Sequence, residues 1–328
     1  MYDVITMGSS TVDVFAHTDQ SEIIDIRSKN KCEEFISYPV GTKMLITRLM
    51  HNMGGNGANS AVAFARLGLK TGYLGKIGTD HNGKLILASL KRERVGFIGA
   101  KGRESGFSIV LDSIEDDRTI LTYKGCNNDL SFKEVKKSRL RTRWFYLSTM
   151  LGESLHTMQR IAEQAKKKKI RVAFNPSATL LEKEKEAALN LLKYTDVLVL
   201  NKEEAEILVG EGSEEENIKK LASHGPSTIV ITDGKNGALA YENGSYYKVM
   251  PRKDLKVVET TGAGDAFAST LTAGLIMKKP FEFCLKMAIN NAESVISHHG
   301  AQNLLLPRKK LFEMASGDKR EIGINKQE

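Results

Sequence analysis

The sequence has few cysteines and no long apolar run. Only three of its 328 residues are cysteine, Cys32, Cys126 and Cys284. Their odd number and wide spacing exclude a disulfide framework and a multi-cysteine zinc site, and they favour a reducing compartment. No stretch approaches the about 20 apolar residues that a membrane-spanning helix needs. The first residues lack the charged and apolar regions of a secretory signal. The sequence therefore predicts a cytoplasmic protein with no membrane partner.

The net charge is positive, +8 from 48 basic and 40 acidic residues. Part of the excess lies in short runs such as Lys166 to Lys169, which are typical of solvated helix ends. No nucleic-acid recognition motif accompanies the charge, so we expect no nucleic-acid partner. A positive protein suits an anionic small substrate, but the charge alone does not identify one.

Short apolar runs alternate with segments of helical period along the chain. This alternation is typical of βαβ units around a mostly parallel sheet. The expected strands are residues 3–8, 71–78, 143–149, 170–176, 196–201 and 227–234. The expected helices are residues 58–68, 83–95, 156–169, 202–210, 262–277 and 283–299. No low-complexity linker interrupts the pattern, which predicts one α/β domain over residues 1–328.

Two regions interrupt the alternation of strands and helices. Residues about 14–50 and 106–124 are strand-like, with turn residues inside them and no helix beside them. The simplest interpretation is a small β layer that projects from the α/β core, and such a sheet over a cleft is often a lid. The alternative is an edge hairpin without function. The exposed edges of a projecting sheet also favour a homodimer formed through the lid.

A glycine-rich stretch, TTGAGDAFAS at residues 260–269, leads into the helix expected at 262–277. A helix N-terminus carries unsatisfied N–H groups and partial positive charge, and glycines let its backbone approach a ligand. Residues 262–264 therefore predict a phosphate-binding anion hole. No Lys-Ser/Thr pair follows, so this is not a Walker A loop. Asp265 follows instead, and a carboxylate there can hold Mg²⁺ or accept a proton from an attacking hydroxyl; the alternative is an Asp that only favours the helix dipole.

A second glycine stretch, GGNGAN at residues 54–59, precedes the helix expected at 58–68. It imitates a dinucleotide-binding fingerprint, but a weak strand precedes it and no acidic residue closes the strand that follows. Asn59 can instead hydrogen-bond a polar substrate. Asp13 follows the first expected strand, at the end where open α/β sheets bind ligands. It can accept hydrogen bonds from sugar hydroxyls, or it can be an ordinary turn residue.

Four segments together resemble the ribokinase-like, or phosphofructokinase B (PfkB), family of carbohydrate kinases. They are MGGNGANSAVAFARLGLKTGYLGKIGTDHNG, NKEEAE, ITDGKNGA and ETTGAGDAFAST, in the order that the family has. The resemblance implies a three-layer α/β/α sandwich with a mostly parallel sheet and a small projecting β-sheet lid. It also implies an ATP-dependent kinase that phosphorylates a hydroxymethyl group of a small carbohydrate. A nucleoside kinase of the same family is the alternative, and a non-catalytic sugar or nucleotide sensor and a dehydrogenase represent other classes.

The resemblance also implies roles for individual residues. Asp265 matches the catalytic base, and Gly262, Ala263 and Gly264 match its anion hole. The positions that match substrate-binding residues are Asp13, Gly54, Gly55 and Asn59. Those that match nucleotide-binding residues are Asn201, Glu204, Thr232, Gly234, Gly237 and, from a late helix, Asn291. Glu204 would also organise Mg²⁺ through water, so ATP and Mg²⁺ are the implied cofactors. Asn175 lies where many members keep a polar residue near the phosphates.

Two positions depart from the family's pattern. Many members have Asp-Thr ahead of the anion hole, where the Asp helps to hold a monovalent cation. This chain has Glu259-Thr260, and the longer side chain makes a monovalent cation requirement doubtful. In ribokinases proper a Lys usually occupies the position of Asn56, which argues against ribose as the substrate.

Overall fold

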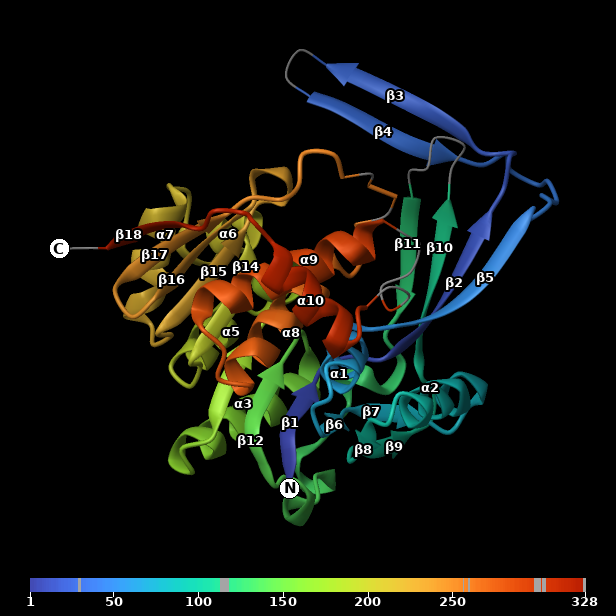
Figure 1. The fold of residues 1–328 in the computed structure, drawn as a ribbon. Coiled ribbons are helices and arrows are strands. Elements are labelled where there is room, and N and C mark those ends of the chain that lie inside the picture. Colours follow the sequence, from blue (N-terminus) through green and yellow to red (C-terminus); the bar gives the residue numbers. More distant parts are fainter. Residues whose placement is uncertain are drawn as a thin grey trace.

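A ten-stranded sheet runs through the centre of the molecule in the order β18-β17-β16-β15-β14-β13-β12-β1-β6-β8 (Figure 1). The structure is a computed structural model, and it describes residues 1–28, 31–112, 118–255, 257–258, 260–297, 302 and 305–326. The strands are β1 (Tyr2–Met7), β6 (Thr71–Leu74), β8 (Gly96–Phe97), β12 (Thr142–Leu147), β13 (Arg171–Phe174), β14 (Val197–Asn201), β15 (Thr228–Thr232), β16 (Ala238–Glu242), β17 (Ser245–Val249) and β18 (Gly323–Lys326). Pairing is parallel from β15 to β8 and antiparallel from β15 to β18.

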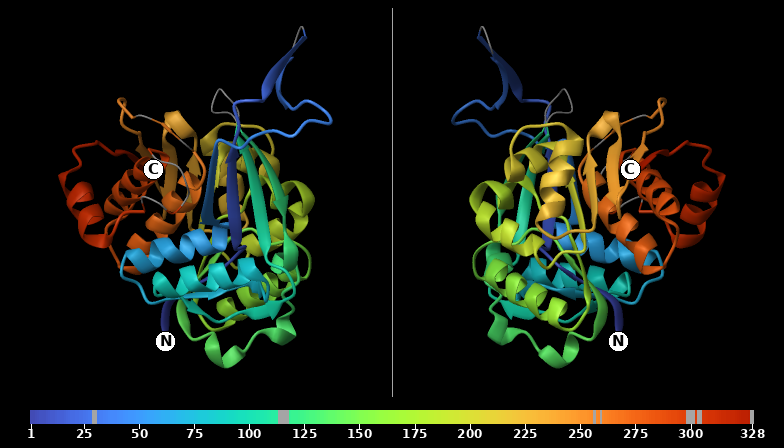
Figure 2. Two further views of the ribbon diagram at one scale, coloured as in Figure 1. Left: turned by 90° about the vertical axis from the view of Figure 1, so that its right-hand side faces the viewer. Right: turned by 90° about the vertical axis from the view of Figure 1, so that its left-hand side faces the viewer.

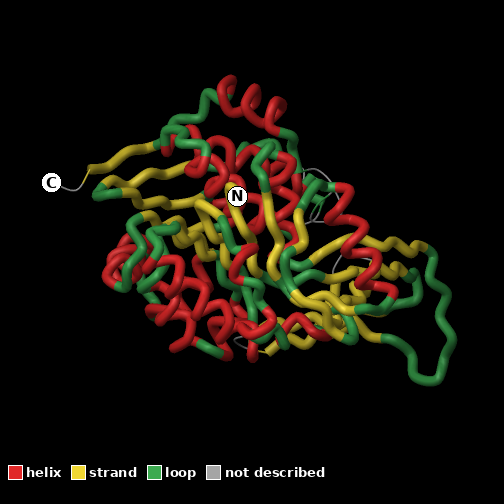
Figure 3. Tube along the Cα trace, turned by 90° about the horizontal axis from the view of Figure 1, so that it is seen from below, coloured by secondary structure: helices red, strands yellow, loops and turns green. Residues whose placement is uncertain are grey.

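Helices cover both faces of this sheet, as the view from below shows (Figure 3). Alternate residues of β1 belong to different cores: Ile5 packs with one set of helices and Val4 with the other. One layer contains α3 (Gly152–Lys167), α4 (Ala178–Lys183), α5 (Lys185–Leu192), α6 (Lys202–Val209) and α7 (Glu214–Ser223). The other contains α1 (Asn56–Arg66), α8 (Ala263–Ile276), α9 (Phe281–Ile296) and α10 (Arg308–Gly317). The predicted three-layer α/β/α fold is confirmed.

A second, four-stranded sheet projects from one end of the core, in the order β11-β10-β2-β5 (Figures 1 and 2). Its strands are β2 (Thr11–His17), β5 (Arg48–Gly54), β10 (Gly106–Asp112) and β11 (Arg118–Tyr123). We call it the lid sheet. Beyond it, β3 (Glu22–Ser28) and β4 (Lys31–Ser37) form a separate hairpin that extends away from the body. The projecting sheet is confirmed, but it begins at Thr11 rather than at residue 14, so Asp13 lies within a lid strand and not in a loop after β1.

One predicted strand is two strands in the structure. Residues 71–78 divide at Gly75 into β6, which pairs with β1, and β7 (Lys76–Gly78), which pairs with β9 (Ala100–Gly102). A Cβ atom at Gly99 would lie 1.8 Å from the Gly75 carbonyl oxygen, so the backbones approach too closely for any larger residue. The chain then continues into α2 (His81–Arg92), which the Asp80 side chain caps. None of the helices in the described segments is long and apolar enough to cross a membrane.

Candidate active site

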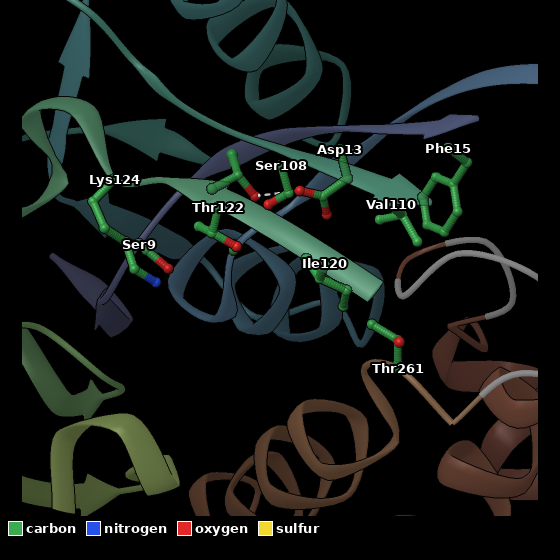
Figure 4. A pocket seen from close by; sticks show the side chains of 11 residues that line it. Ser9, Asp13, Phe15, Ser108, Val110, Ile120, Thr122, Lys124 and Thr261 are labelled. Atoms are coloured by element: carbon green, nitrogen blue, oxygen red, sulfur yellow. Dashed lines mark hydrogen bonds between the residues drawn. The ribbon is translucent and has the colours of Figure 1, made fainter. Parts of the chain in front are cut away.

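The inner face of the lid sheet lines a cavity of about 160 Å³, which we call the lid cavity (Figure 4). Strand register brings Asp13, Ser108 and Thr122 into one row across β2, β10 and β11. The next row toward the tip is apolar, with Phe15, Val110 and Ile120. Ser9, Thr11, Gly55, Lys124 and Thr261 complete the lining, with Lys124 near Ser9 and Thr261 near Ile120 (Figure 4). The cavity therefore offers polar groups near the core and apolar ones toward the tip.

Two glycines of the GGNGAN stretch allow close packing beside the lid cavity, Gly54 against Asp13 and Gly55 against Ser9. Thr11 Oγ1 donates a hydrogen bond to Asp13 Oδ1 over 2.9 Å. A Cβ atom at Gly54 would lie 1.8 Å from Asp13 Oδ2, so only glycine leaves room for this carboxylate. Gly55 has φ 88° and a Cβ atom there would lie 2.6 Å from the Ser9 carbonyl oxygen. The structure thus brings Asp13, Gly54 and Gly55 together at the lid cavity. The contribution of Gly54 is that its lack of a side chain leaves room for the Asp13 carboxylate.

A second cavity of about 300 Å³, which we call the core cavity, lies at the carboxyl ends of β13, β14 and β15. Its lining includes six of the predicted residues, Asn201, Glu204, Thr232, Gly262, Gly264 and Asp265, together with Asn175. Parallel strands present their carboxyl ends at one edge, and ligands of open α/β sheets bind there. Neighbouring residues line the two cavities at two places in the chain: Gly55 and Thr261 line the lid cavity, and Asn56 and Gly262 line the core cavity.

The N-terminus of α8 faces the core cavity. Gly262 is the N-cap with φ 83°, a left-handed conformation that favours glycine. Gly264 has no such constraint, and a Cβ atom there would meet no protein atom within 4 Å. Neither the backbone conformation nor protein packing therefore requires a glycine at position 264. The missing side chain does leave space for a ligand to approach the start of α8. The N–H of Ala263 is already used, since it donates to the Thr260 carbonyl over 3.2 Å.

Asp265 lies in the first turn of α8 and is held by an amide relay. Asn59 Nδ2 donates to Asp265 Oδ2 over 3.0 Å, and Gln302 Nε2 donates to Asn59 Oδ1 over 2.8 Å. Burial raises the pKa of Asp265 to about 6, against a lowering by the Asn59 bond. Asn59 is itself buried and both ends of its amide are used. In this structure Asn59 orients Asp265 and lines neither cavity, and its role toward the substrate stays a prediction.

Asn201 and Glu204 form a capping box at the start of α6. Asn201 Oδ1 accepts from the Glu204 N–H and Glu204 Oε2 accepts from the Asn201 N–H, both over 2.8 Å. Burial, together with the charge of Asp265, raises the pKa of Glu204 to about 7, against a lowering by the backbone N–H groups of Asn201 and Ala178. Two carboxylates with raised pKa values in one cavity favour a bound cation, because a cation would relieve both burial and repulsion.

The donors of this cavity fit Mg²⁺ in one specific way. No group of three or more His, Cys, Asp or Glu residues in the described segments could hold a metal ion. Mg²⁺ commonly keeps several waters and binds through one or two carboxylates plus substrate phosphates. Glu204 and Asp265 match that arrangement, so a metal here would need a phosphate ligand to complete its shell.

The remaining nucleotide-binding predictions have different outcomes. Thr232 ends β15 and lines the core cavity. Gly234 and Gly237 form the turn between β15 and β16, with φ 47° and 87°, and line neither cavity. Asn291 is buried: its Nδ2 donates to Thr270 Oγ1 over 2.7 Å and its Oδ1 accepts from the Leu306 N–H over 2.9 Å. In this structure the Asn291 amide joins α9 to α8 and to the segment before α10 and lines neither cavity, so its contact with a nucleotide stays a prediction.

Sequence reasoning missed the polar residues on the lid strands β10 and β11. Ser108, Thr122 and Lys124 line the lid cavity, but no motif contains them. Their only sequence signal is the alternation in GFSIV and in ILTYK, where every second residue faces the cavity. Gln302, which holds Asn59, carried no signal at all.

Comparisons with known proteins agree with this geometry. The sequence profile described as pfkB family carbohydrate kinase matches residues 20–309. A ribokinase of Haemophilus influenzae is 29% identical over 86% of this chain and 94% of its own length. A 5-dehydro-2-deoxygluconokinase of Bacillus subtilis is 27% identical over 77% of this chain and 83% of its own length.

Solved structures show the same fold at lower identity. Arabidopsis thaliana ribokinase, complexed with ribose and ATP, superimposes with a TM-score of 0.80 at 20% identity, over 97% of this chain and 99% of its own. The nucleoside kinase of Methanocaldococcus jannaschii gives 0.78 at 19% identity, over 96% and 99%. Because the family profile covers most of the sequence and the site has the expected carboxylate and helix start, the chain belongs to the pfkB family of carbohydrate kinases.

Proposed function

We propose that this protein transfers the γ-phosphate of MgATP to a hydroxymethyl group of a small carbohydrate, and that the chain works as a single domain with its lid. One observation carries the assignment of the site: Asp265 lies in the first turn of α8 and lines the core cavity, and just before this helix Thr261 lines the lid cavity and Gly262 the core cavity. A sugar in the lid cavity and a triphosphate in the core cavity would then both reach this carboxylate. The test is ADP release with MgATP and a panel of monosaccharides.

A nucleoside is the second candidate substrate, because a nucleoside kinase shares the fold. The size of the lid cavity favours a monosaccharide, since about 160 Å³ is below the about 300–1,000 Å³ of sites for larger ligands. The curated relatives include both ribokinases and 5-dehydro-2-deoxygluconokinases, so their names leave a neutral sugar and a sugar acid open. A non-catalytic sensor would not need a carboxylate held by two successive amide hydrogen bonds.

The proposed reaction uses the groups in the following way. Asp13 accepts hydrogen bonds from substrate hydroxyls and fixes the sugar. Asp265, oriented by Asn59, accepts the proton of the attacking hydroxyl as its oxygen bonds to the γ-phosphorus and ADP leaves. The N-terminus of α8 stabilises the negative charge that develops on the transferred phosphoryl group. Mg²⁺, held by the phosphates and by Glu204 through water, would neutralise phosphate charge. Closure of the lid sheet would exclude water, which competes as the acceptor.

The first prediction concerns Asp13. Replacing Asp13 by Ala is expected to weaken sugar binding by about 1.5–3 kcal/mol, the range for hydrogen bonds to a charged group. ATP binding should change little, because Asp13 does not line the core cavity. Calorimetric titration of each ligand measures both effects. Asp25→Ala, on the exposed β3–β4 hairpin, is the control; equal losses for sugar and ATP would contradict a sugar-specific role.

The second prediction concerns monovalent cations. Glu259 lies outside the described residues, so the expectation rests on its longer side chain alone. Turnover in NaCl, KCl and choline chloride at matched ionic strength should differ by less than about threefold, which is under ~1 kcal/mol in the barrier. Matched ionic strength is needed because screening alone affects ATP binding to a protein of net charge +8. A tenfold increase specific to KCl would show that Glu259 replaces the usual Asp.

We also propose a homodimer that forms through the lid, in a cytoplasmic protein. The support is the exposed apolar side chains of the lid and its hairpin, among them Ile26 at 53%, Leu49 at 56% and Leu121 at 52% exposure. Exposed apolar side chains that gather on one projecting element favour association. Sedimentation should show a dimer that Leu49→Glu shifts to a monomer. For the compartment, the support is that Cys126 and Cys284 are free and buried.

A further inference from the structure

The inner face of the lid sheet carries a cation at its core end. Lys124 directly follows β11 and lies at the core end of this face (Figure 4). Next to it comes the polar row of Thr122, Ser108 and Asp13, and then the apolar row that contains Ile120. The register that pairs Phe107 with Tyr123 places Lys124 opposite Gly106. Strand periodicity then puts Lys124 on the same face as Thr122, toward the cavity.

Lys124 forms no ion pair in the part of the chain that the structure describes. None of its ion pairs involves this ammonium group, and no side-chain hydrogen bond uses it. Burial lowers the pKa of Lys124, as does the charge of Lys183, whereas the charge of Asp13 raises it. Asp13 and Lys124 are the two charged residues among the described lining of the lid cavity, and they lie on the same face of the lid sheet without forming an ion pair.

The core cavity shows the opposite electrostatics. No lysine or arginine is among its described lining residues, and its two carboxylates are Glu204 and Asp265. A lysine that served the nucleotide phosphates would be expected to line that cavity, as the phosphate-binding lysine of other nucleotide sites does. Lys124 instead lines the lid cavity, where the sugar is proposed to bind.

We propose that the carbohydrate substrate carries an anionic group, a carboxylate or a phosphate, and that Lys124 binds it. This inference rests on the proposed sugar kinase function and narrows its substrate class to acidic sugars. The anionic end lies at Lys124, at the core end of the lid face, and the neutral hydroxyls lie at Asp13, one row further out. This orientation keeps the anion away from the Asp13 carboxylate. The substrate's terminal hydroxymethyl group then extends past Gly55 and Thr261 toward Asp265.

The test compares matched substrates that differ in charge. We would measure kcat and KM with MgATP for D-fructose, 2-keto-D-gluconate and D-fructose 6-phosphate, and for D-glucitol and D-gluconate. The proteins are the wild type, Lys124→Met, Lys124→Arg, and Lys183→Met as a neighbouring lysine that does not line the lid cavity. Thermal melts establish that each variant folds. Comparison of the carboxylate with the phosphate ester identifies which anionic group is recognised.

The expected result is a wild-type kcat/KM at least tenfold higher for one acidic sugar than for its neutral counterpart. Lys124→Met should lower kcat/KM for that acid by about 10- to 100-fold, mainly through KM, and change the neutral sugar by less than threefold. Lys124→Arg should restore most of the loss, and Lys183→Met should have a smaller effect.

Two results would overturn the inference and leave the kinase function intact. The first is a wild type that phosphorylates neutral sugars as well as acidic ones. The second is an equal loss for both substrates in Lys124→Met, which would place Lys124 on the transferred phosphoryl group. Phosphorylation of nucleosides but of no sugar in the panel would instead overturn the proposed function itself, and the inference with it.

Discussion

Asp265→Asn is expected to lower kcat by about 100-fold or more, with KM for the sugar changed far less. Asn has the size of Asp but cannot accept the proton of the attacking hydroxyl, and general base catalysis is typically worth 10²–10⁴-fold. The Asn59 amide can still donate to the new side chain, so the local structure should persist. Steady-state kinetics at the pH optimum measure the loss; turnover close to that of the wild type would remove Asp265 from the role of base.

The same substitution is expected to stabilise the ligand-free protein. Because burial raises the folded-state pKa of Asp265 to about 6, the ionised carboxylate costs stability above that pH. The unfolded-state pKa is near 3.8, so the cost is absent below that value, develops as pH rises toward 6 and is constant above. At pH 8 it is at most about 3 kcal/mol. Asp265→Asn should therefore raise Tm by a few degrees at pH 8, and by roughly half as much at pH 5.

Asp80→Asn is the matched control for both effects. Asp80 caps α2, and its carboxylate accepts hydrogen bonds from the Gly83 N–H and from Ser105. These bonds hold the pKa of Asp80 below its usual value, so the same chemical change should lower Tm and leave kcat unchanged. A ligand-free Asp265→Asn variant that melts below the wild type at pH 8 would contradict the buried-charge argument, whatever its activity.

The proposed catalysis would also depend on pH through this carboxylate. As pH falls below the pKa of Asp265, protonation removes the base, and kcat/KM for the sugar at saturating MgATP should decline tenfold per pH unit. The decline should begin at or below pH 6, because bound MgATP places a cation beside the carboxylate and lowers its pKa.

Local sequence patterns predicted the strands and helices of the α/β core, whose burial follows from the layered arrangement of the sheet and its helices. The core strands are apolar on both faces because helices cover both, so they are visible as continuous apolar runs. The lid was predicted only from the two regions that interrupt the alternation of strands and helices along the chain. The start of its first strand was misplaced because only residues 8–10 separate β1 from β2, so that the two strands resemble one strand and its turn.

Partners far apart in the sequence could not be predicted in this way. Asn59 was assigned to the substrate because its amide lies at a helix start. Its hydrogen-bond partners, Asp265 and Gln302, are 206 and 243 residues away. Lys124 illustrates the same limit. The alternation that runs through β11 places Lys124 on one face of the lid sheet, but only the pairing of β10 with β2 makes this face the wall of a cavity.

Glu204→Gln is expected to raise the Mg²⁺ concentration needed for half-maximal activity by about 10- to 100-fold, the usual cost of losing a group that supports a metal site. Gln retains an oxygen that accepts from the Asn201 N–H, so the capping box should persist. What is lost is the negative charge in the core cavity. Initial rates at saturating sugar and ATP, over Mg²⁺ from micromolar to tens of millimolar, measure the shift, and high Mg²⁺ should restore much of the activity.

Glu216→Gln separates this metal role from helix capping. Glu216 forms the equivalent capping box with Ser213 at the start of α7, where Glu216 Oε2 accepts from the Ser213 N–H over 2.9 Å. Its environment has the opposite effect: hydrogen bonds from Ser213 lower the pKa of the exposed Glu216, whereas burial raises that of Glu204. Since the local motif is the same, only the core cavity distinguishes the two residues. Glu216→Gln should leave the Mg²⁺ dependence unchanged, and an unchanged dependence in Glu204→Gln would reduce Glu204 to a helix cap.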